Sequence, residues 1–141
     1  LQAIALGKRG DLTSSKSVVW SLLRGVPYVP CPMLWGEEIY LLDDQSFFSC
    51  LRAVDGKPYY LKHRLPGNLN FSASPVGAAD KIYLLSEEGT TIVLGRGSDI
   101  KVIAINKLNE TFYASPAIVG DAIYLRGNKH LFCIKKSTRL D

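Results

Sequence analysis

The chain has 141 residues, 47% of them hydrophobic and 21% charged, which is the length and composition of one globular domain. Its formal net charge of +4 comes from Lys and Arg residues spread singly along the chain, which argues against a nucleic-acid-binding protein. Its apolar runs are shorter than the roughly 20 residues that span a bilayer, no signal peptide is recognisable, and three cysteines cannot form a fully paired intrachain framework.

The first predicted elements lie before residue 26. The segments LQAIALG (1–7) and SVVWSLLR (17–24) have the apolar, β-branched character of strands. We expect them to be the third and fourth strands of a unit whose first two strands are missing. No window shows a convincing helical period of apolar residues, so the prediction for the whole chain is all-β.

A repeat dominates the rest of the chain. A proline followed seven residues later by Ile-Tyr-Leu occurs at Pro32, Pro75 and Pro116, at spacings of 43 and 41 residues. In each copy the pattern predicts a short strand after the proline, a turn with carboxylates, the Ile-Tyr-Leu strand and a third strand. A fourth strand follows in the first two copies, PYYLKHRL (58–65) and KVIAINKL (101–108).

Repeated units of 40–45 residues with four antiparallel strands are typical of β-propeller blades, which bury their faces by stacking on like neighbours. The predicted fold class is therefore an all-β propeller segment of about 13 strands in one domain; a β-sandwich of short hairpins is the alternative. The predicted units are a partial blade at 1–26, full blades at 30–66 and 73–109, and a three-stranded partial blade at 114–137.

The repeats resemble the pyrroloquinoline-quinone-like (PQQ-like) propeller family. The stretch 73–94 carries ASP…IYL…G…L, and LRAVDGKPYY (51–60) resembles the LDAxTGKxxW turn of that repeat. Tyr59 or Tyr60 stands where Trp is usual, whereas Trp20 in SVVWSLL keeps that Trp. The resemblance covers about 3–136 and implies an incomplete propeller of about three blades.

The family resemblance implies two candidate functions. The first is a non-catalytic module for protein interaction or scaffolding, with no cofactor and no catalytic, cofactor-binding or metal residue. The alternative is a fragment of a quinoprotein dehydrogenase that holds PQQ over Ca²⁺, although the adjacent cysteines and a matching ligand set are not found. The family also includes a lipoprotein propeller of outer-membrane protein assembly. The resemblance implies a periplasmic or extracytoplasmic location, which the sequence itself leaves unknown.

About three blades are fewer than the four to eight of closed propellers. We expect the chain to be part of a longer propeller, an open arc with protected ends, or half of a homodimer. In the dimer, the strand at 18–23 of one copy completes the last blade of the other and covers exposed strand edges. The residues expected at this assembly edge are Val18, Val19, Trp20, Leu22, Leu131, Phe132 and Cys133.

The histidines and cysteines favour structural roles. His63 and His130 lie on different predicted strands without a ligand-spaced partner, so neither is expected to bind a metal. His130 and Cys133 are three positions apart and would face opposite sides of a strand, which argues against a catalytic pair. Cys31, Cys50 and Cys133 stand in apolar surroundings and are expected to be buried.

Acidic pairs and one glycine-rich segment are also expected to be structural. The pairs at 37–38, 43–44 and 87–88 fall in predicted hairpin turns, where solvation is the expected state. The segment GRGSD (95–99) follows no strand–helix unit, so it predicts a turn between two strands and not a phosphate-binding loop.

Overall fold

The fold was examined in a computed structural model that describes residues 1–13 and 15–136. All regular structure in these residues is β-strand, and 13 strands form four antiparallel sheets, which confirms the predicted fold class. Sheet A has two strands, sheets B and C have four each, and sheet D has three. No helix with the length and hydropathy needed to cross a membrane occurs in the described residues.

The strands follow the chain in simple up-and-down order. Sheet A contains β1 (Gln2–Ile4) and β2 (Val18–Ser21), and sheet B contains β3 (Met33–Trp35), β4 (Glu38–Leu42), β5 (Phe47–Arg52) and β6 (Pro58–Arg64). Sheet C contains β7 (Val76–Ala78), β8 (Lys81–Leu85), β9 (Thr90–Gly95) and β10 (Val102–Lys107), and sheet D contains β11 (Ala117–Val119), β12 (Ala122–Arg126) and β13 (Leu131–Lys135).

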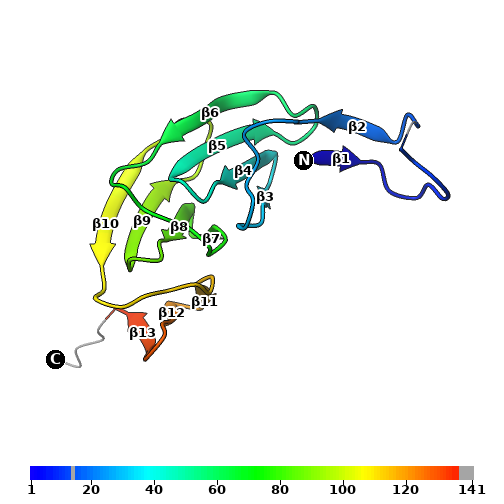
Figure 1. Ribbon diagram of the computed structural model, residues 1–141. Coiled ribbons are helices and arrows are strands. Elements are labelled where there is room, and N and C mark those ends of the chain that lie inside the picture. The colour runs from blue at the N-terminus through cyan, green and yellow to red at the C-terminus, as the bar shows by residue number, and fades with distance from the viewer. Residues whose placement is uncertain (14, 137–141) are drawn as a thin grey trace.

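The four sheets succeed one another along an open arc, with sheet A and sheet D at its two ends (Figure 1). The first strand of each unit, β3, β7 or β11, lies on the inner side of the arc, and β2, β6 and β10 run along the outer side. Each sheet therefore has the strand order of a blade, from the inner edge outward.

The turns between the second and third strands of sheets B and C share one construction. Asp43 Oδ1 accepts hydrogen bonds from the main-chain N–H groups of Gln45 (2.9 Å) and Phe47 (2.8 Å), and Ser86 Oγ accepts one from Thr90 N–H (3.1 Å). In the second turn Gly89 has φ +83°, and a Cβ there would lie 2.2 Å from the carbonyl oxygen of Leu108. The short polar residue thus fixes the turn by accepting main-chain hydrogen bonds, and glycine allows the next linker to pass close by.

The main core lies between sheets B and C. Sheet B contributes Tyr40, Phe48 and the half-buried Tyr60, whose rings form a continuous row with centroid distances of 5.9 Å and 6.2 Å. Sheet C covers the row with four fully buried aliphatic side chains: Ile82, Leu84, Ile92 and Leu94. Each such side chain is worth about 1.5–3 kcal/mol of transfer free energy when buried. The contact between sheets B and C is the best-packed part of the molecule.

The core between sheets C and D is smaller. Its buried members are Ala73, Leu85, Phe112 and Leu125, with Phe132 packed on Phe112 at a centroid distance of 5.8 Å. By strand register, Thr91 and Ala104 of sheet C stand where sheet B has Phe48 and Tyr60. The smaller side chains leave this contact less completely filled.

The expectation for the cysteines was correct only for Cys50, which is buried. Cys31 and Cys133 are exposed, because Cys31 faces the open N-terminal side of sheet B's first strand and Cys133 lies on the edge strand β13. The predicted last unit extends to residue 137, which lies outside the described residues.

Candidate assembly surfaces

The residues expected at an assembly edge lie at opposite ends of the arc. Val18, Val19 and Trp20 are on β2 and Leu22 follows it, whereas the other three are on β13. The structure therefore does not bring the two groups together within one chain (Figure 1). They can meet only where an end of the arc contacts another set of strands.

At the N-terminal end, Trp20 already packs on its own chain. Its indole Nε1–H donates to the carbonyl oxygen of Ala53 (2.8 Å), and a Cβ at Gly56 would come within 2.6 Å of the ring. The ring thus lies flat against a glycine that has φ +69°. This contact holds β2 against the turn between β5 and β6. It places β2 as the outer strand of a blade that precedes sheet B.

One edge of β2 is covered by β1. The paired residues are Gln2 with Ser21, Ala3 with Trp20 and Ile4 with Val18, and the register shifts between the last two pairs. The half-buried Val18 and the 56% exposed Val19 leave apolar surface on this small sheet. A two-stranded sheet is marginal on its own, so sheet A depends on its contact with sheet B.

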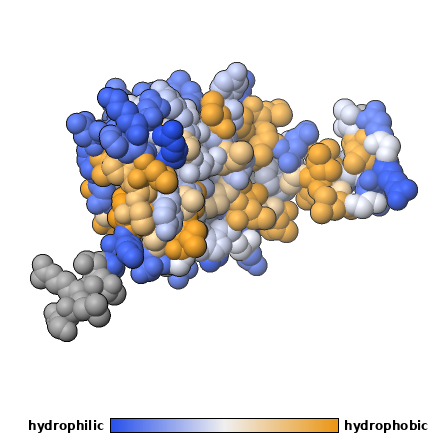
Figure 2. Space-filling view, turned by 90° about the horizontal axis from the view of Figure 1, so that it is seen from below, coloured by the Kyte–Doolittle hydropathy of each residue, from blue (hydrophilic) through white to orange (hydrophobic). Residues whose placement is uncertain are grey.

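At the C-terminal end, sheet D presents a free strand edge. Its order is β11-β12-β13, and β13 pairs only with β12 among the described strands. Leu131 is 67% exposed, Cys133 is exposed beside Tyr124, and Phe132 is half-buried against Phe112. Figure 2 shows hydrophobic surface on this end of the molecule. An unpaired apolar edge strand is a site for strand addition.

A groove beside this edge separates sheets C and D. Its cavity volume is about 370 Å³. Apolar side chains from both sheets dominate the lining, and the polar groups of Asn106 and Lys107 lie at its outer part, at the end of β10. Lining residues from sheet C are Tyr83, Thr91 and Val93, and from sheet D Ile123, Leu125 and Ile134. The groove lies next to the place where a fourth strand of sheet D would run.

A chain of hydrogen bonds joins the inner edges of the units. The N–H of Cys31 donates to Ser74 Oγ (2.9 Å), and the N–H of Ser74 donates to Ser115 Oγ (2.9 Å). Each of these residues directly precedes the proline of its repeat. We call Cys31, Ser74 and Ser115 the inner belt. It sets the spacing between successive blades on the inner side.

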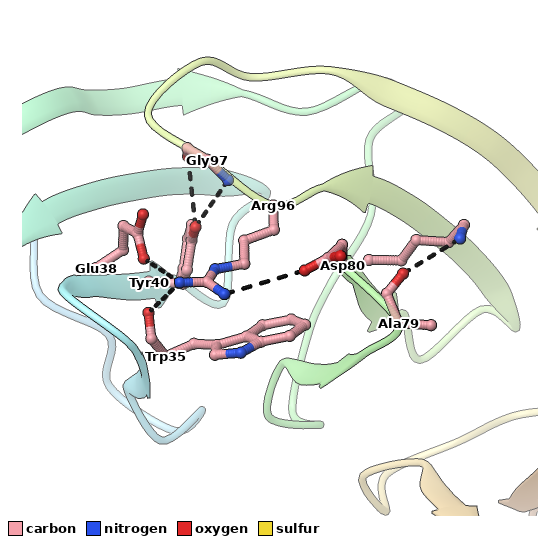
Figure 3. A network of polar contacts seen from close by, with 8 residues as sticks. Trp35, Glu38, Tyr40, Ala79, Asp80, Arg96 and Gly97 are labelled. Atoms are coloured by element: carbon pink, nitrogen blue, oxygen red, sulfur yellow. Dashed lines mark hydrogen bonds and ion pairs between the residues drawn. The ribbon is translucent and has the colours of Figure 1, made fainter. Parts of the chain in front are cut away.

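Arg96 links sheets B and C on another side of their contact (Figure 3). Its guanidinium donates to Glu38 Oε2 (2.9 Å) and stacks over the Trp35 ring, with Cζ 4.9 Å from the centroid. The N–H of Gly97 donates to the Tyr40 hydroxyl (2.9 Å). The hydrogen bond to Glu38 is the main reason that the Arg96 pKa is raised, and burial raises the pKa of Tyr40. These contacts fix the blades and leave no free cation for a ligand at this point.

The segment 95–99 is therefore the turn that was expected, but its role as a link between sheets was missed. Glu38 was expected to be solvated, and this was wrong because its side chain is only 20% exposed and pairs with Arg96. The contact joins residues 58 positions apart, so no local pattern reveals it.

The remaining candidates lie apart from one another. His63 is exposed on β6, and His130 is exposed and hydrogen-bonded to Glu110 (2.9 Å), which lowers the pKa of that carboxyl. Glu88 accepts hydrogen bonds from Asn70 (2.8 Å from Nδ2), so this acidic pair serves the link between blades. No group of three or more His, Cys, Asp or Glu side chains close enough to share a metal ion occurs in residues 1–13 and 15–136.

Comparison with known proteins supports the fold. No protein-family model matches the chain, and no curated protein matches it. The crystal structure of BamB from Moraxella catarrhalis, a β-propeller, matches with a TM-score of 0.62 and 14% sequence identity. The match covers 86% of this chain but only 37% of the BamB chain, so the chain spans well under half the length of this neighbour. The likeness shows the fold, a partial β-propeller.

Proposed function

We propose that this chain is a non-catalytic β-propeller segment that acts as a protein-interaction or scaffolding module, and that its open ends take up further blades. One observation carries the proposal: sheet D ends in the unpaired edge strand β13, next to an apolar groove. The missing blades come from a second copy or from the rest of a longer chain. The PQQ-like resemblance and the BamB neighbour support an extracytoplasmic module of this kind.

The proposal explains how the polar groups are used. The hydrogen-bonding groups of Trp20, Glu38 and Arg96 serve contacts between neighbouring sheets. What the ends of the arc offer is main-chain hydrogen-bonding groups and apolar side chains. These features recognise a β-strand through ladder hydrogen bonds, with side-chain contacts providing selectivity.

A photocrosslinking pair tests the proposal. A benzophenone amino acid is placed at Leu131 on β13, and the control carries it at Val119 on β11 of the same sheet; both side chains are 67% exposed. We expect a crosslink to an extended polypeptide segment from position 131 and none from position 119, with the partner segment identified by mass spectrometry. Equal crosslinking from both positions, or none from either, would contradict the proposed use of the β13 edge.

A further inference from the structure

We propose that the ring is closed by a second copy of this chain, joined head to tail, so that sheet D of one copy is followed by sheet B of the other. This inference rests on the proposed function and names its partner. The supporting observations are the inner belt, the complementary strand content of the two ends and the number of blades that two copies provide.

The inner belt has a direction and two open ends. Each N–H donates to the side chain of the next repeat, from Cys31 to Ser74 and from Ser74 to Ser115. Among residues 15–136, the N–H of Ser115 has no acceptor. At the other end, the exposed Cys31 thiol stands where the later repeats have the accepting hydroxyl. A second copy placed after sheet D brings its own Cys31 to Ser115, and sulfur is a weak acceptor.

The strand content of the two ends is complementary. Sheet D has the three inner strands of a blade and lacks the outer one, whereas β2 is an outer strand that Trp20 holds in front of sheet B. When sheet B of a second copy follows sheet D, its attached β2 therefore arrives beside β13. Because side chains alternate along a strand, Val19 then points away from the Trp20 contact and toward the groove next to sheet D.

The pairing requires β13 of the second copy to replace β1. Strand β1 occupies the edge of β2 that faces inward in the blade order, and it pairs through three residues with an irregular register. Strand β13 has five residues in regular register with β12. The longer, regular strand offers β2 the better partner.

The number of copies follows from the blade count. Sheets B and C are complete, and sheet D becomes complete with a borrowed β2, so each copy supplies three blades. Two copies give six blades, which lies within the four to eight of closed propellers, and three copies would exceed this range. A head-to-tail contact that closes after two copies has two equal seams.

A disulfide test addresses the seam directly. Ser115→Cys is introduced together with Cys133→Ser, and the protein is oxidised at a concentration at which the wild-type chain is associated. We expect a covalent dimer of twice 15.6 kDa, with a disulfide between Cys31 and the introduced thiol, and its loss when Cys31→Ser is added. The control Ser74→Cys in the same background should form a disulfide with Cys31 inside one chain, because these two residues adjoin in the belt.

Each outcome bears on the inference. A Ser74→Cys protein that links internally beside a Ser115→Cys protein that stays monomeric would overturn the second copy. If β13 then still crosslinks to another polypeptide from position 131, the proposed function stands and only the partner changes. Failure of the Ser74→Cys link would overturn the belt itself.

A second variant tests the replacement of β1. Ala3→Pro removes a main-chain donor from β1 and weakens its pairing with β2. We expect the protein concentration at half-dimerisation to fall at least severalfold, since β2 then accepts β13 more readily. An unchanged or higher value would overturn the replacement of β1.

Discussion

Gly56→Ala tests the contact between sheet A and sheet B, on which the position of β2 depends. Gly56 has φ +69°, and an added Cβ would lie 2.6 Å from Trp20 Cδ2 and 2.7 Å from Cε3. The left-handed backbone costs a non-glycine residue about 1–2 kcal/mol. Displacing the indole also loses its hydrogen bond to Ala53, worth about 0.5–1.5 kcal/mol. Together with the lost packing, we expect a total of about 2–4 kcal/mol.

The matched control is Gly120→Ala in the turn between β11 and β12. Gly120 also has a positive φ, +59°, but no atom lies within 4 Å of an added Cβ. We expect this variant to lose only the backbone term, about 1–2 kcal/mol. The assay combines urea unfolding with hydrogen exchange, in which β1 and β2 should lose protection only in Gly56→Ala. Equal losses in both variants, with unchanged exchange in β2, would refute the docking of Trp20.

Three further predictions concern the blade contacts, the buried thiol and the cofactor. Arg96→Met should cost about 1–3 kcal/mol in urea unfolding because it leaves the partly buried Glu38 without its partner, whereas Lys57→Met, at a 75% exposed ion pair, should cost under about 0.5 kcal/mol; equal effects would argue against the Arg96 link. Burial raises the pKa of Cys50 to about 11, so the folded state keeps a proton that the unfolded state releases, and stability should fall as pH rises above about 9. At pH 8 a thiol reagent should label Cys31 and Cys133 quickly and Cys50 only on unfolding; rapid labelling of all three would contradict this burial. PQQ with Ca²⁺ should leave the Tm of the isolated chain unchanged, and a rise at saturating ligand would favour the dehydrogenase alternative.

The fold could be predicted from the sequence because its blades repeat. Pro32, Pro75 and Pro116 begin equivalent inner segments, and the Ile-Tyr-Leu that follows each of them lies on β4, β8 or β12. A pattern that recurs at constant spacing reports a shared local structure, and like blades must stack to bury both faces. The 13 strands follow from this reasoning alone.

The contacts between blades were harder to predict. Arg96 reaches Glu38 across 58 positions, and Ser74 accepts from Cys31 across 43, so neither pair forms a local motif. The residues before the prolines, Cys, Ser and Ser, were a visible signal for the inner belt, since small polar side chains in equivalent positions suit a repeated hydrogen bond. The exposure of Cys31 could not be predicted, because it depends on the arc being open at that end.

The most direct test of the account is the molar mass of the chain in solution, measured by light scattering over a range of concentrations. The account predicts a dimer of twice 15.6 kDa in which the β13 amides are protected from hydrogen exchange. A compact monomer of 15.6 kDa at all concentrations, with β13 exchanging as a free edge, would contradict closure by a second copy.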